Sequence, residues 1–356
     1  MKRMKGLSLF ASAGIAEMNL KKCGIDMILA NELIDIRAKT HVFWHQNCEV
    51  ICGDITSDNI KNNIIEKAKK SKVDFILATP PCQGVSLVGK NKTNDDMLND
   101  PRNFLIFHAF EVIDQLNPKV IVIENVDRFL TMKFPYDGGF YNIEYIVRKK
   151  YGEKYSINVN VYNAQDYGVP QSRKRVIIVL YNNEFIFTEP KKVKPVTVRQ
   201  AIGDLPSLEA GESSNIKNHY AREHTEAHVI CMKHTPTGHS AFENEIYFPK
   251  NKDGIRLKGY SATYKRIEWD KPAPTITMRN DAISSQSNVH PGRLLPNGLY
   301  SDARVLTLRE LFILSSIDPD LDVPDFASDI QVRFMIGEAV PPKLIETICK
   351  NLKAVK

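Results

Sequence analysis

The chain has 356 residues, of which 43% are hydrophobic and 25% charged, close to the averages of globular proteins. This length fits one large domain or two of ordinary size, and the composition excludes a disordered, collagen-like or coiled-coil protein. The net charge of +6 permits a polyanionic partner but does not demand one.

The sequence has no apolar stretch approaching the roughly 18 residues of a membrane helix and no secretion signal at its start. We therefore expect a cytoplasmic protein with no membrane partner. The six cysteines are scattered along the chain, so reduced thiols are expected rather than disulfides.

Short apolar runs followed by turn residues recur along the first half of the chain, and each predicts a strand. The expected strands are residues 5–10, 27–30, 49–52, 73–77, 119–123, 156–162 and 175–181. The fifth is nearly all β-branched, which is typical of a strand covered by helices on both faces. Alternation with helical stretches predicts an α/β fold with a doubly wound, mostly parallel sheet.

The pattern changes at Glu189. From there to residue 303 clean periods are few, and six of the nine histidines lie there. Helical patterns return at 307–314 and 342–352. We expect a first domain at 1–188, a second, smaller and irregular domain at 189–303, and a C-terminal segment at 304–356 that completes the first.

The turn after the first expected strand, from Phe10 to Gly14, consists mainly of small residues. Such a turn at a helix start lets a nucleotide-like ligand approach backbone amides, although close packing of helix on strand explains it equally well. Glu32 follows about 20 residues later, where an acidic side chain can bind ribose hydroxyls, and Asp54 can reach an adenine amino group. The turn has no Lys or Arg, so a nucleoside without phosphate fits.

Cys82 lies in the segment Thr79 to Gly84 (TPPCQG), after the fourth expected strand, where ligands bind in open α/β sheets. A lone free cysteine is more often a buried apolar side chain. The polar stretch 87–99, however, is typical of a mobile surface loop, and a lid beside a thiol favours catalysis.

The fifth expected strand ends in Glu124 and Asn125. Burial raises the pKa of a carboxyl group, so that it can hold a proton for donation; a helix N-cap, filled by Asn125 or Asp127, is the alternative. Farther on, Arg173 and Arg175 are expected on one face of a strand, where they would bind an anion, either a phosphate or the Glu124 carboxylate.

These segments, taken in order, resemble the DNA cytosine-5 methyltransferases, and the resemblance spans nearly the whole chain. The matching segments are the turn with its flanking strands (4–31), TPPCQG (79–84), ENV (124–126), Gln171 with Arg173 and Arg175, KPAPTIT (271–277), Arg304 to Glu310, and Ile336 to Pro342. Several short motifs in one register make coincidence a poor explanation. The resemblance implies the fold of S-adenosylmethionine-dependent methyltransferases.

The resemblance implies a reaction that needs each of these side chains. The Cys82 thiolate attacks carbon-6 of cytosine, Glu124 protonates or hydrogen-bonds the ring N3, Arg173 holds the base oxygen and Arg175 orders the site. Because the target atoms lie inside a duplex, the base must be flipped out; methyltransferases are among the handful of enzyme classes in which this is expected. The implied catalytic residues are Cys82, Gln83, Glu124, Asn125, Arg173 and Arg175.

The cofactor implied is S-adenosyl-L-methionine. Its implied binding residues are Phe10, Ala11, Ser12, Ala13, Gly14, Ile15, Glu32, Leu33, Asp54, Ile55, Pro80 and Glu338. Three of these depart from the family pattern: many relatives have Gly at Ser12, an aromatic residue at Leu33 and Asn at Glu338.

Residues 189–303 would then be the target-recognition domain, reading double-stranded DNA through phosphate and base contacts. Basic and amide side chains there, and a serine of the TPPCQG loop, are the expected DNA-binding residues: Ser86, Lys265, Arg266, Arg279, Asn280 and Arg293. A monomer is expected, and a restriction endonuclease acting on the same site is the partner that family inference suggests.

Two groups of histidines and cysteines suggest metal binding. We reject a zinc site at His41, His45, Cys48 and Cys52, because Cys52 falls within an apolar strand. The group from His219 to His239 matches no metal motif, so solvated or DNA-facing histidines are expected there and no metal is predicted.

Other functions remain open. One branch of the family methylates transfer RNA, but the long irregular region favours duplex DNA. A non-catalytic binder is disfavoured by the intact Cys82, Glu124 and Arg173, and a thiol hydrolase by the lack of a histidine beside Cys82.

Overall fold

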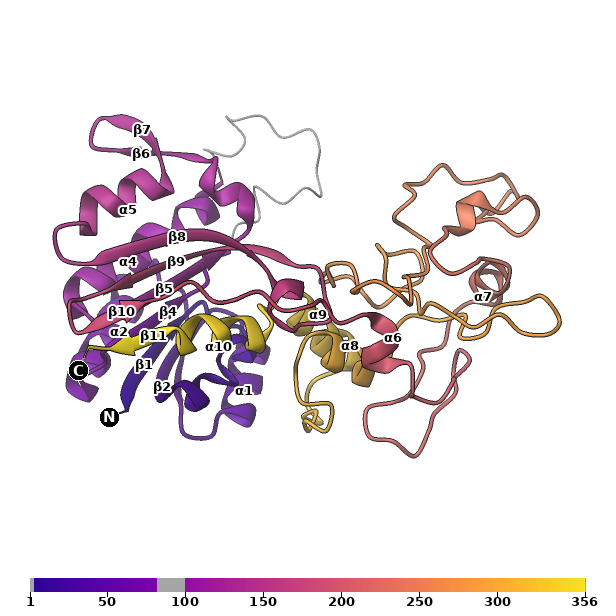
Figure 1. Ribbon diagram of the computed structural model, residues 1–356, viewed down its shortest axis with the longest axis horizontal. Coiled ribbons are helices and arrows are strands. Elements are labelled where there is room, and N and C mark those ends of the chain that lie inside the picture. The colour runs from indigo at the N-terminus through magenta and orange to yellow at the C-terminus, as the bar shows by residue number, and fades with distance from the viewer. Residues whose placement is uncertain (1–2, 82–99, 356) are drawn as a thin grey trace. The chain divides into compact units, whose positions relative to one another are not determined.

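The computed structural model describes residues 3–81 and 100–355, which form two compact units (Figure 1). Unit 1 comprises Met1–Asn163, Lys174–Lys191 and Ile345–Lys356, and unit 2 comprises Ala164–Arg173 and Lys192–Leu344. In the described ranges, no helix has both the length and the apolar character that crossing a bilayer would require.

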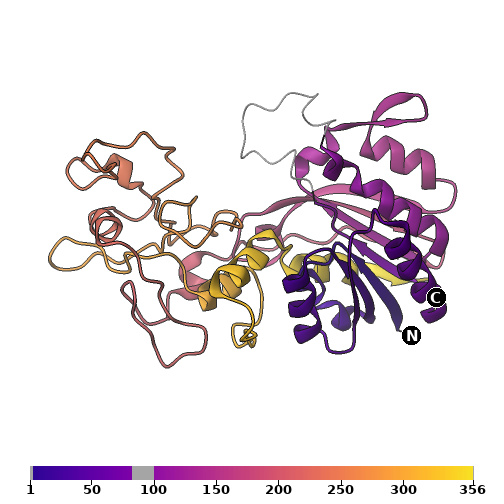
Figure 2. The ribbon, with the colours of Figure 1, turned by 180° about the vertical axis from the view of Figure 1, so that it is seen from behind.

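Unit 1 is built on a sheet that has seven strands among the described residues, in the order β3-β2-β1-β4-β5-β9-β8 (Figures 1 and 2). The first five are parallel, and β9 is antiparallel to both of its neighbours. The strands are β1 (Met4–Leu9), β2 (Ile25–Glu32), β3 (Glu49–Cys52), β4 (Phe75–Ala78), β5 (Val120–Asn125), β8 (Ser156–Asn163) and β9 (Lys174–Tyr181). The predicted mostly parallel α/β fold is confirmed, and the ends of the strands differ from expectation by two residues or fewer.

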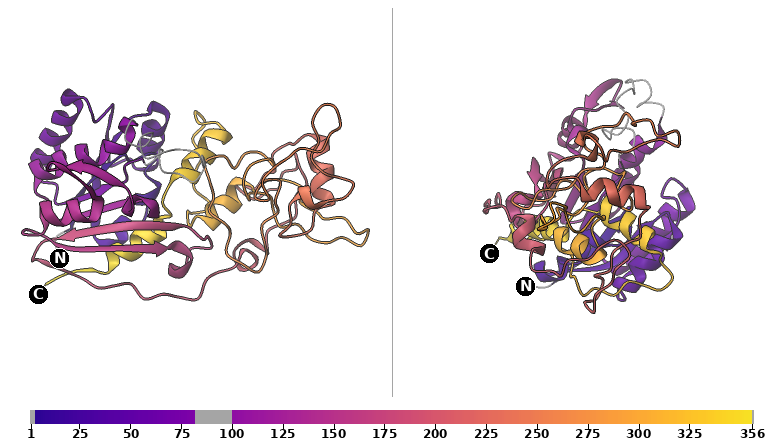
Figure 3. Two further views of the ribbon diagram at one scale, coloured as in Figure 1. Left: turned by 90° about the horizontal axis from the view of Figure 1, so that it is seen from above. Right: turned by 90° about the vertical axis from the view of Figure 1, so that its right-hand side faces the viewer.

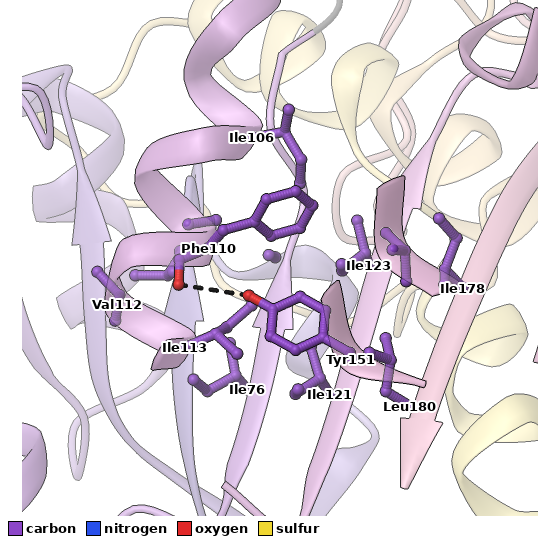
Figure 4. Packing of buried hydrophobic residues seen from close by; sticks show 14 of the residues in the cluster. Ile76, Ile106, Phe110, Val112, Ile113, Ile121, Ile123, Tyr151, Ile178 and Leu180 are labelled. Carbon is purple, nitrogen blue, oxygen red and sulfur yellow. Dashed lines mark hydrogen bonds between the residues drawn. The ribbon is translucent and has the colours of Figure 1, made fainter. Parts of the chain in front are cut away.

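Three helices cover one face of this sheet: α2 (Asp58–Ser71), α4 (Leu105–Leu116) and α5 (Ile143–Tyr151). Phe110 of α4 packs on isoleucines from β4, β5 and β9, and the Tyr151 hydroxyl donates to its backbone carbonyl (3.4 Å; Figure 4). Each fully buried side chain of this size contributes about 1.5–3 kcal/mol. The sheet is therefore a rigid base for the residues at its carboxyl edge.

The other elements of unit 1 lie around this core. They are α1 (Asp35–Trp44), the hairpin β6 (Lys133–Tyr136) and β7 (Gly139–Asn142), and the antiparallel pair β10 (Phe185–Phe187) and β11 (Leu352–Ala354). β11 follows α10 (Pro342–Lys350), so the C-terminus pairs with a strand that directly follows β9.

Unit 2 has few regular elements, as expected for an irregular region (Figure 3). Its helices are α6 (Val198–Ile202), α7 (Glu226–Lys233), α8 (Leu308–Leu314) and α9 (Asp329–Glu338). The first expected boundary, at 189, lies near Lys191, but residues 304–344 belong to unit 2 and the return to unit 1 begins only at Ile345. α9 stays with unit 2 because Arg333 donates to the carbonyls of Asn280 (3.2 Å) and Leu306 (2.9 Å).

A buried ion pair between Arg304 and Glu310 holds the start of α8. Its two bonds measure 2.8 Å (Nη1 to Oε2) and 3.0 Å (Nη2 to Oε1). Glu310 also accepts from the backbone N of Thr307 (2.7 Å), which completes a capping box. Burial alone would raise the pKa of Glu310, but Arg304 outweighs it, and the pKa is lowered to about 2.

Unit 2 is expected to lose stability in mild acid. Burial lowers the pKa of His224 to about 4 and that of His290 to about 3, from an ordinary 6.5. Between pH 4 and 6.5 the unfolded chain therefore binds protons that folded unit 2 does not, and Glu310 adds to the effect between pH 2 and 4.5. Scanning calorimetry should show a melting temperature that falls steadily as the pH drops from 6.5 to 4.

His224→Gln tests this directly, because glutamine keeps an acceptor for the Val305 amide, which lies 3.3 Å from His224 Nε2. The variant should show a shallower fall of melting temperature with pH. If the melting temperature of His224→Gln fell with pH as steeply as that of the wild type, His224 would not be a source of the acid sensitivity.

Candidate active site

The turn at the carboxyl end of β1 is left-handed at three positions. Phe10, Ser12 and Gly14 have φ of 61°, 48° and 75°. The chain then enters two short 3₁₀ helices, η1 (Ile15–Glu17) and η2 (Leu20–Cys23), where the sequence indicated the start of a helix. Left-handed φ favours glycine, which gives a conformational reason for the glycine that the family pattern implies at position 12.

Glu32, the last residue of β2, fixes this turn. Its Oε2 accepts from the backbone N of Ser12 (2.8 Å), and its Oε1 accepts from the backbone N of Ile34 (2.9 Å). A carboxylate offers about four acceptor positions, so these two bonds leave capacity for ribose hydroxyls. Ala11, Ala13 and Ile15 are buried, so their side chains pack inside unit 1.

The residues expected to contact adenine lie near the strand ends beside Glu32. Asn31 Nδ2 donates to the carbonyls of Ile51 (2.9 Å) and Gly53 (3.0 Å), which ties β2 to the loop bearing Asp54. Asp54 is exposed and accepts from the backbone N of Thr56 (2.9 Å). Of the neighbouring candidates, Ile55 is buried and Leu33 is exposed.

Glu17, His41 and His45 form a cluster against the turn, in which Glu17 and His41 are buried and His45 is half-buried. The sequence analysis considered the two histidines but did not single out Glu17. His45 Nε2 donates to the Gly14 carbonyl (2.9 Å), and His41 Nε2 bonds Glu17 Oε2 (3.1 Å). Burial alone would raise the pKa of Glu17, but His41 lowers it, so Glu17 is a carboxylate. A side chain at position 14 would lie about 2.6 Å from the His45 ring, so glycine is required there.

We expect His45→Ala to weaken binding of S-adenosylmethionine, the cofactor that the family resemblance implies. The variant loses the donor to the Gly14 carbonyl, a bond that contributes about 1 kcal/mol, and the left-handed turn is held less firmly. Titration calorimetry should show a Kd for S-adenosylmethionine raised about 5-fold, with kcat at saturating cofactor unchanged. His108→Ala in α4 is the control, and His45→Gln should recover part of the affinity. Equal Kd values for His45→Ala and wild type would contradict this role.

Two members of this cluster, His41 and His45, also belong to the group of residues at which a zinc site was rejected. The ligating atoms of Glu17, His41 and His45 lie within 4.8 Å of one another. Cys48 is buried and Cys52 exposed, and neither belongs to this group of three. The histidine bonds to Glu17 and to the Gly14 carbonyl account for the geometry.

Glu124 and Arg175 form a buried ion pair across adjacent strands β5 and β9. Arg175 Nε lies 2.8 Å from Glu124 Oε1, and the two side chains are 13% and 8% exposed. Asn125 Nδ2 donates to the Pro80 carbonyl (2.9 Å), which holds the end of β5 against the segment after β4. The carboxyl edge of the sheet thus brings together Glu124, Arg175, Asn125 and Pro80.

Cys82, Gln83 and Ser86 lie outside the described residues, as does the polar stretch 87–99. Pro80 is buried and precedes Cys82 by two residues. Nearby, Thr79 Oγ1 donates to the Phe10 carbonyl (3.0 Å), which joins this segment to the turn after β1.

Arg173 does not share a strand face with Arg175, so that expectation is wrong. β9 begins at Lys174, and Arg173 belongs to unit 2. Its guanidinium is buried and donates to the carbonyls of Ile276 (2.9 Å), Gly337 (3.0 Å) and Glu338 (3.1 Å). Of the two arginines, Arg175 pairs with the Glu124 carboxylate. Glu338 is the last residue of α9 in unit 2.

Two of the expected DNA-binding residues support the interior of unit 2 instead. Arg266 is fully buried and donates to four backbone carbonyls, those of Met232, His290, Ser301 and Asp302, at 2.7–3.1 Å. Asn280 is buried and donates to the Thr277 and Arg333 carbonyls. Their side chains therefore satisfy buried backbone acceptors, and the expectation that they contact DNA is wrong.

Arg293 stays a prediction as a DNA contact, because its side chain is 36% exposed. Its guanidinium donates to the Gly203 carbonyl (3.1 Å) and pairs with the fully buried Asp302 (3.3 Å). Lys265 is half-buried and Arg279 exposed, so both keep surface available for a partner.

The histidines between 219 and 239 do not converge. His219 is fully buried and bonds Thr307 Oγ1 (3.1 Å), so the expectation of a solvated or DNA-facing side chain is wrong there. His228 Nε2 bonds the Tyr264 hydroxyl (3.0 Å), His234 stacks on Tyr247, and His239 bonds Glu243. Each has a separate partner.

Comparison with known proteins gives this geometry a context. The C-5 cytosine-specific DNA methylase family matches residues 4–354. The Type II methyltransferase M1.HgaI of Avibacterium volantium is 47% identical over 99% of this chain and 98% of its own. M1.HphI of Haemophilus parahaemolyticus, also a Type II methyltransferase, is 30% identical over 97% and 85%.

Solved structures show the same fold. The methyltransferase EhMeth of Entamoeba histolytica superposes with a TM-score of 0.65 at 16% identity, covering 99% of this chain and 98% of its own. A mutant of Spodoptera frugiperda DNMT2 gives 0.63 at 17% identity, covering 98% and 99%. The expected enzyme class, a DNA cytosine-5 methyltransferase, is confirmed, and the chain belongs to the C-5 cytosine-specific DNA methylase family.

Proposed function

We propose that this enzyme transfers a methyl group from S-adenosylmethionine to carbon-5 of a cytosine flipped out of duplex DNA, through a covalent adduct with Cys82. The observation that carries the proposal is the Glu124–Arg175 pair, whose strand end is bonded through Asn125 to Pro80, two residues before Cys82. An acid, a guanidinium and Pro80, two residues before Cys82 in the sequence, thus belong to one sheet edge, where α/β folds bind ligands.

The side chains divide the chemistry among them. The Cys82 thiolate forms a bond to carbon-6 while electron density moves to N3, where Glu124 supplies a proton or hydrogen bond. Arg175, held beside Glu124, is better placed than Arg173 to bind the base oxygen, because Arg173 uses both Nη atoms on backbone carbonyls. After methylation, loss of the carbon-5 proton restores the ring double bond and breaks the sulfur–carbon bond.

The turn after β1 fits the cofactor. Bound there, S-adenosylmethionine supplies an electrophilic methyl group. Glu32, already fixed by the Ser12 amide, would hold the ribose, and Asp54 with Ile55 the adenine. Glu338 as a further contact, a cytoplasmic location, a monomeric state and a cognate endonuclease also belong to the proposal; the likeness to Type II methyltransferases supports the last.

The test supplies tritiated S-adenosylmethionine with unmethylated plasmid DNA or with transfer RNA, and includes Cys82→Ser. Label in DNA cytosine that is absent from the mutant supports the proposal. Label in RNA alone would identify RNA, rather than DNA, as the substrate. Normal cofactor binding without label in either would indicate a non-catalytic binder.

A further inference from the structure

We propose that Glu17, His41 and His45 bind a divalent transition metal of the zinc class, and that the bound metal weakens binding of S-adenosylmethionine at the neighbouring turn. The three side chains offer one ligand atom each, and these atoms lie within 4.8 Å of one another. Two imidazoles and one carboxylate are a ligand set that zinc takes in proteins. Metal binding rests on this geometry alone, whereas the effect on the cofactor also rests on the proposed function.

The spacing of the ligand atoms fits a tetrahedral metal. Zinc bonds of about 2.0–2.1 Å to nitrogen and oxygen place neighbouring ligand atoms about 3.3 Å apart. His41 Nε2 lies 3.1 Å from Glu17 Oε2, so this pair already has nearly that separation. His45 follows His41 by four residues, and the centres of the two rings lie 4.7 Å apart. Histidines with this spacing on one side of a helix can share a metal.

The protonation states of the three side chains suit a cation. Burial alone would raise the pKa of Glu17, but His41 lowers it, so Glu17 supplies a negative charge. Burial lowers the pKa of His45, so its ring is neutral near pH 7 and can give a lone pair to a metal. Glu17 and His41 are buried, whereas His45 is half-buried, so an ion enters from the His45 side.

The carbonyl of Gly14 connects these three residues to the cofactor turn. It accepts a hydrogen bond from His45 Nε2 (2.9 Å). A Cβ at position 14 would lie 2.6 Å from His45 Nε2 and 2.8 Å from His41 Cδ2, the carbon bonded to Nε2, so the Nε2 edges of both rings face Gly14. A metal held by these nitrogens takes the place of their protons, and the Gly14 carbonyl then loses its donor.

The metal and the cofactor are therefore expected to oppose each other. Saturating metal should raise the Kd for S-adenosylmethionine about 5-fold, the same factor as His45→Ala, because both remove the hydrogen bond to Gly14. Coupling between two ligands is reciprocal, so saturating S-adenosylmethionine should raise the Kd for the metal by the same factor.

The test titrates Co²⁺, a visible-absorbing substitute for Zn²⁺, into Cys82→Ser, which removes a competing thiol. One equivalent should bind and give the absorption of a tetrahedral site. Glu17→Gln in this background keeps an oxygen for the His41 N–H but loses the charged ligand, so Co²⁺ binding should weaken at least about 10-fold. His41→Gln should weaken it likewise. His108→Ala is the matched control, since His108 pairs with the carboxylate of Glu111 elsewhere in unit 1 (3.6 Å).

Titration calorimetry of S-adenosylmethionine with and without Co²⁺ measures the coupling. The inference would be overturned if no tetrahedral absorption appeared, if the folded Glu17 and His41 variants bound Co²⁺ as tightly as Cys82→Ser, or if Co²⁺ left the cofactor Kd unchanged. Should both variants fail to fold, the reciprocal effect of cofactor on Co²⁺ binding to Cys82→Ser decides. A chain that binds Co²⁺ but no S-adenosylmethionine would refute the proposed function instead.

Discussion

Cys82→Ala is expected to abolish methyl transfer, with kcat falling by on the order of 10⁶-fold, as happens when an enzyme loses its nucleophile. Carbon-5 of cytosine is a weak nucleophile until carbon-6 is attacked, so no other side chain replaces the thiolate. Binding of cofactor and of DNA should remain. Single-turnover assays with tritiated S-adenosylmethionine measure the rate.

A second readout isolates the covalent step. DNA with 5-fluorocytosine at the target position cannot release a proton from carbon-5, so the adduct should persist and survive denaturing electrophoresis with wild type but not with Cys82→Ala. Cys231→Ala is the matched control, because Cys231 is a buried thiol of unit 2. Transfer at more than about one hundredth of the wild-type rate by Cys82→Ala would refute covalent catalysis.

Glu124→Gln is expected to lower kcat by about 10²- to 10⁴-fold, the usual contribution of a positioned acid or base. Glutamine keeps an oxygen for Arg175 but cannot deliver a proton to N3, so charge that forms on the ring during attack is left without compensation. KM for DNA and for the cofactor should change little. Rapid-quench kinetics at saturating substrates gives the chemical rate.

The ion pair with Arg175 adds a stability effect that must be separated from catalysis. Removing one partner of a buried ion pair leaves the other charge uncompensated and lowers the free energy of unfolding by about 3–5 kcal/mol. Glu124→Ala should therefore lower the melting temperature, and Glu124→Gln should lower it less. Glu49→Gln on β3, an exposed carboxylate paired with Lys67, is the control. If Glu124→Gln kept more than about a tenth of kcat, Glu124 would be a structural residue only.

The sequence by itself determined the sheet and the positions of its polar ends. Runs such as residues 119–123 are nearly all β-branched, and this local pattern persists whatever lies across the sheet, so all seven strands were predicted. The carboxyl ends of parallel strands share one edge, so Glu32 and Glu124 were placed correctly at strand ends, and the order of the motifs identified the family.

Only the tertiary structure decided which partner each buried polar group has. Arg173 and Arg175 are two residues apart, yet one binds carbonyls of unit 2 and the other binds Glu124. Arg266 has the composition of a DNA contact but fills a buried site lined by four carbonyls. A buried donor must be satisfied by whichever acceptor the fold brings to it, and that acceptor is distant in sequence.

The same reason explains the cluster at the cofactor turn and the unit boundary. Glu17 lies 24 residues before His41, and only the packing of η1 against α1 joins them. Likewise, Arg333 bonds the carbonyl of Asn280, 53 residues earlier, and so keeps α9 in unit 2. Local patterns set strands, turns and motifs, whereas pairing of buried charge across long separations depends on the complete fold.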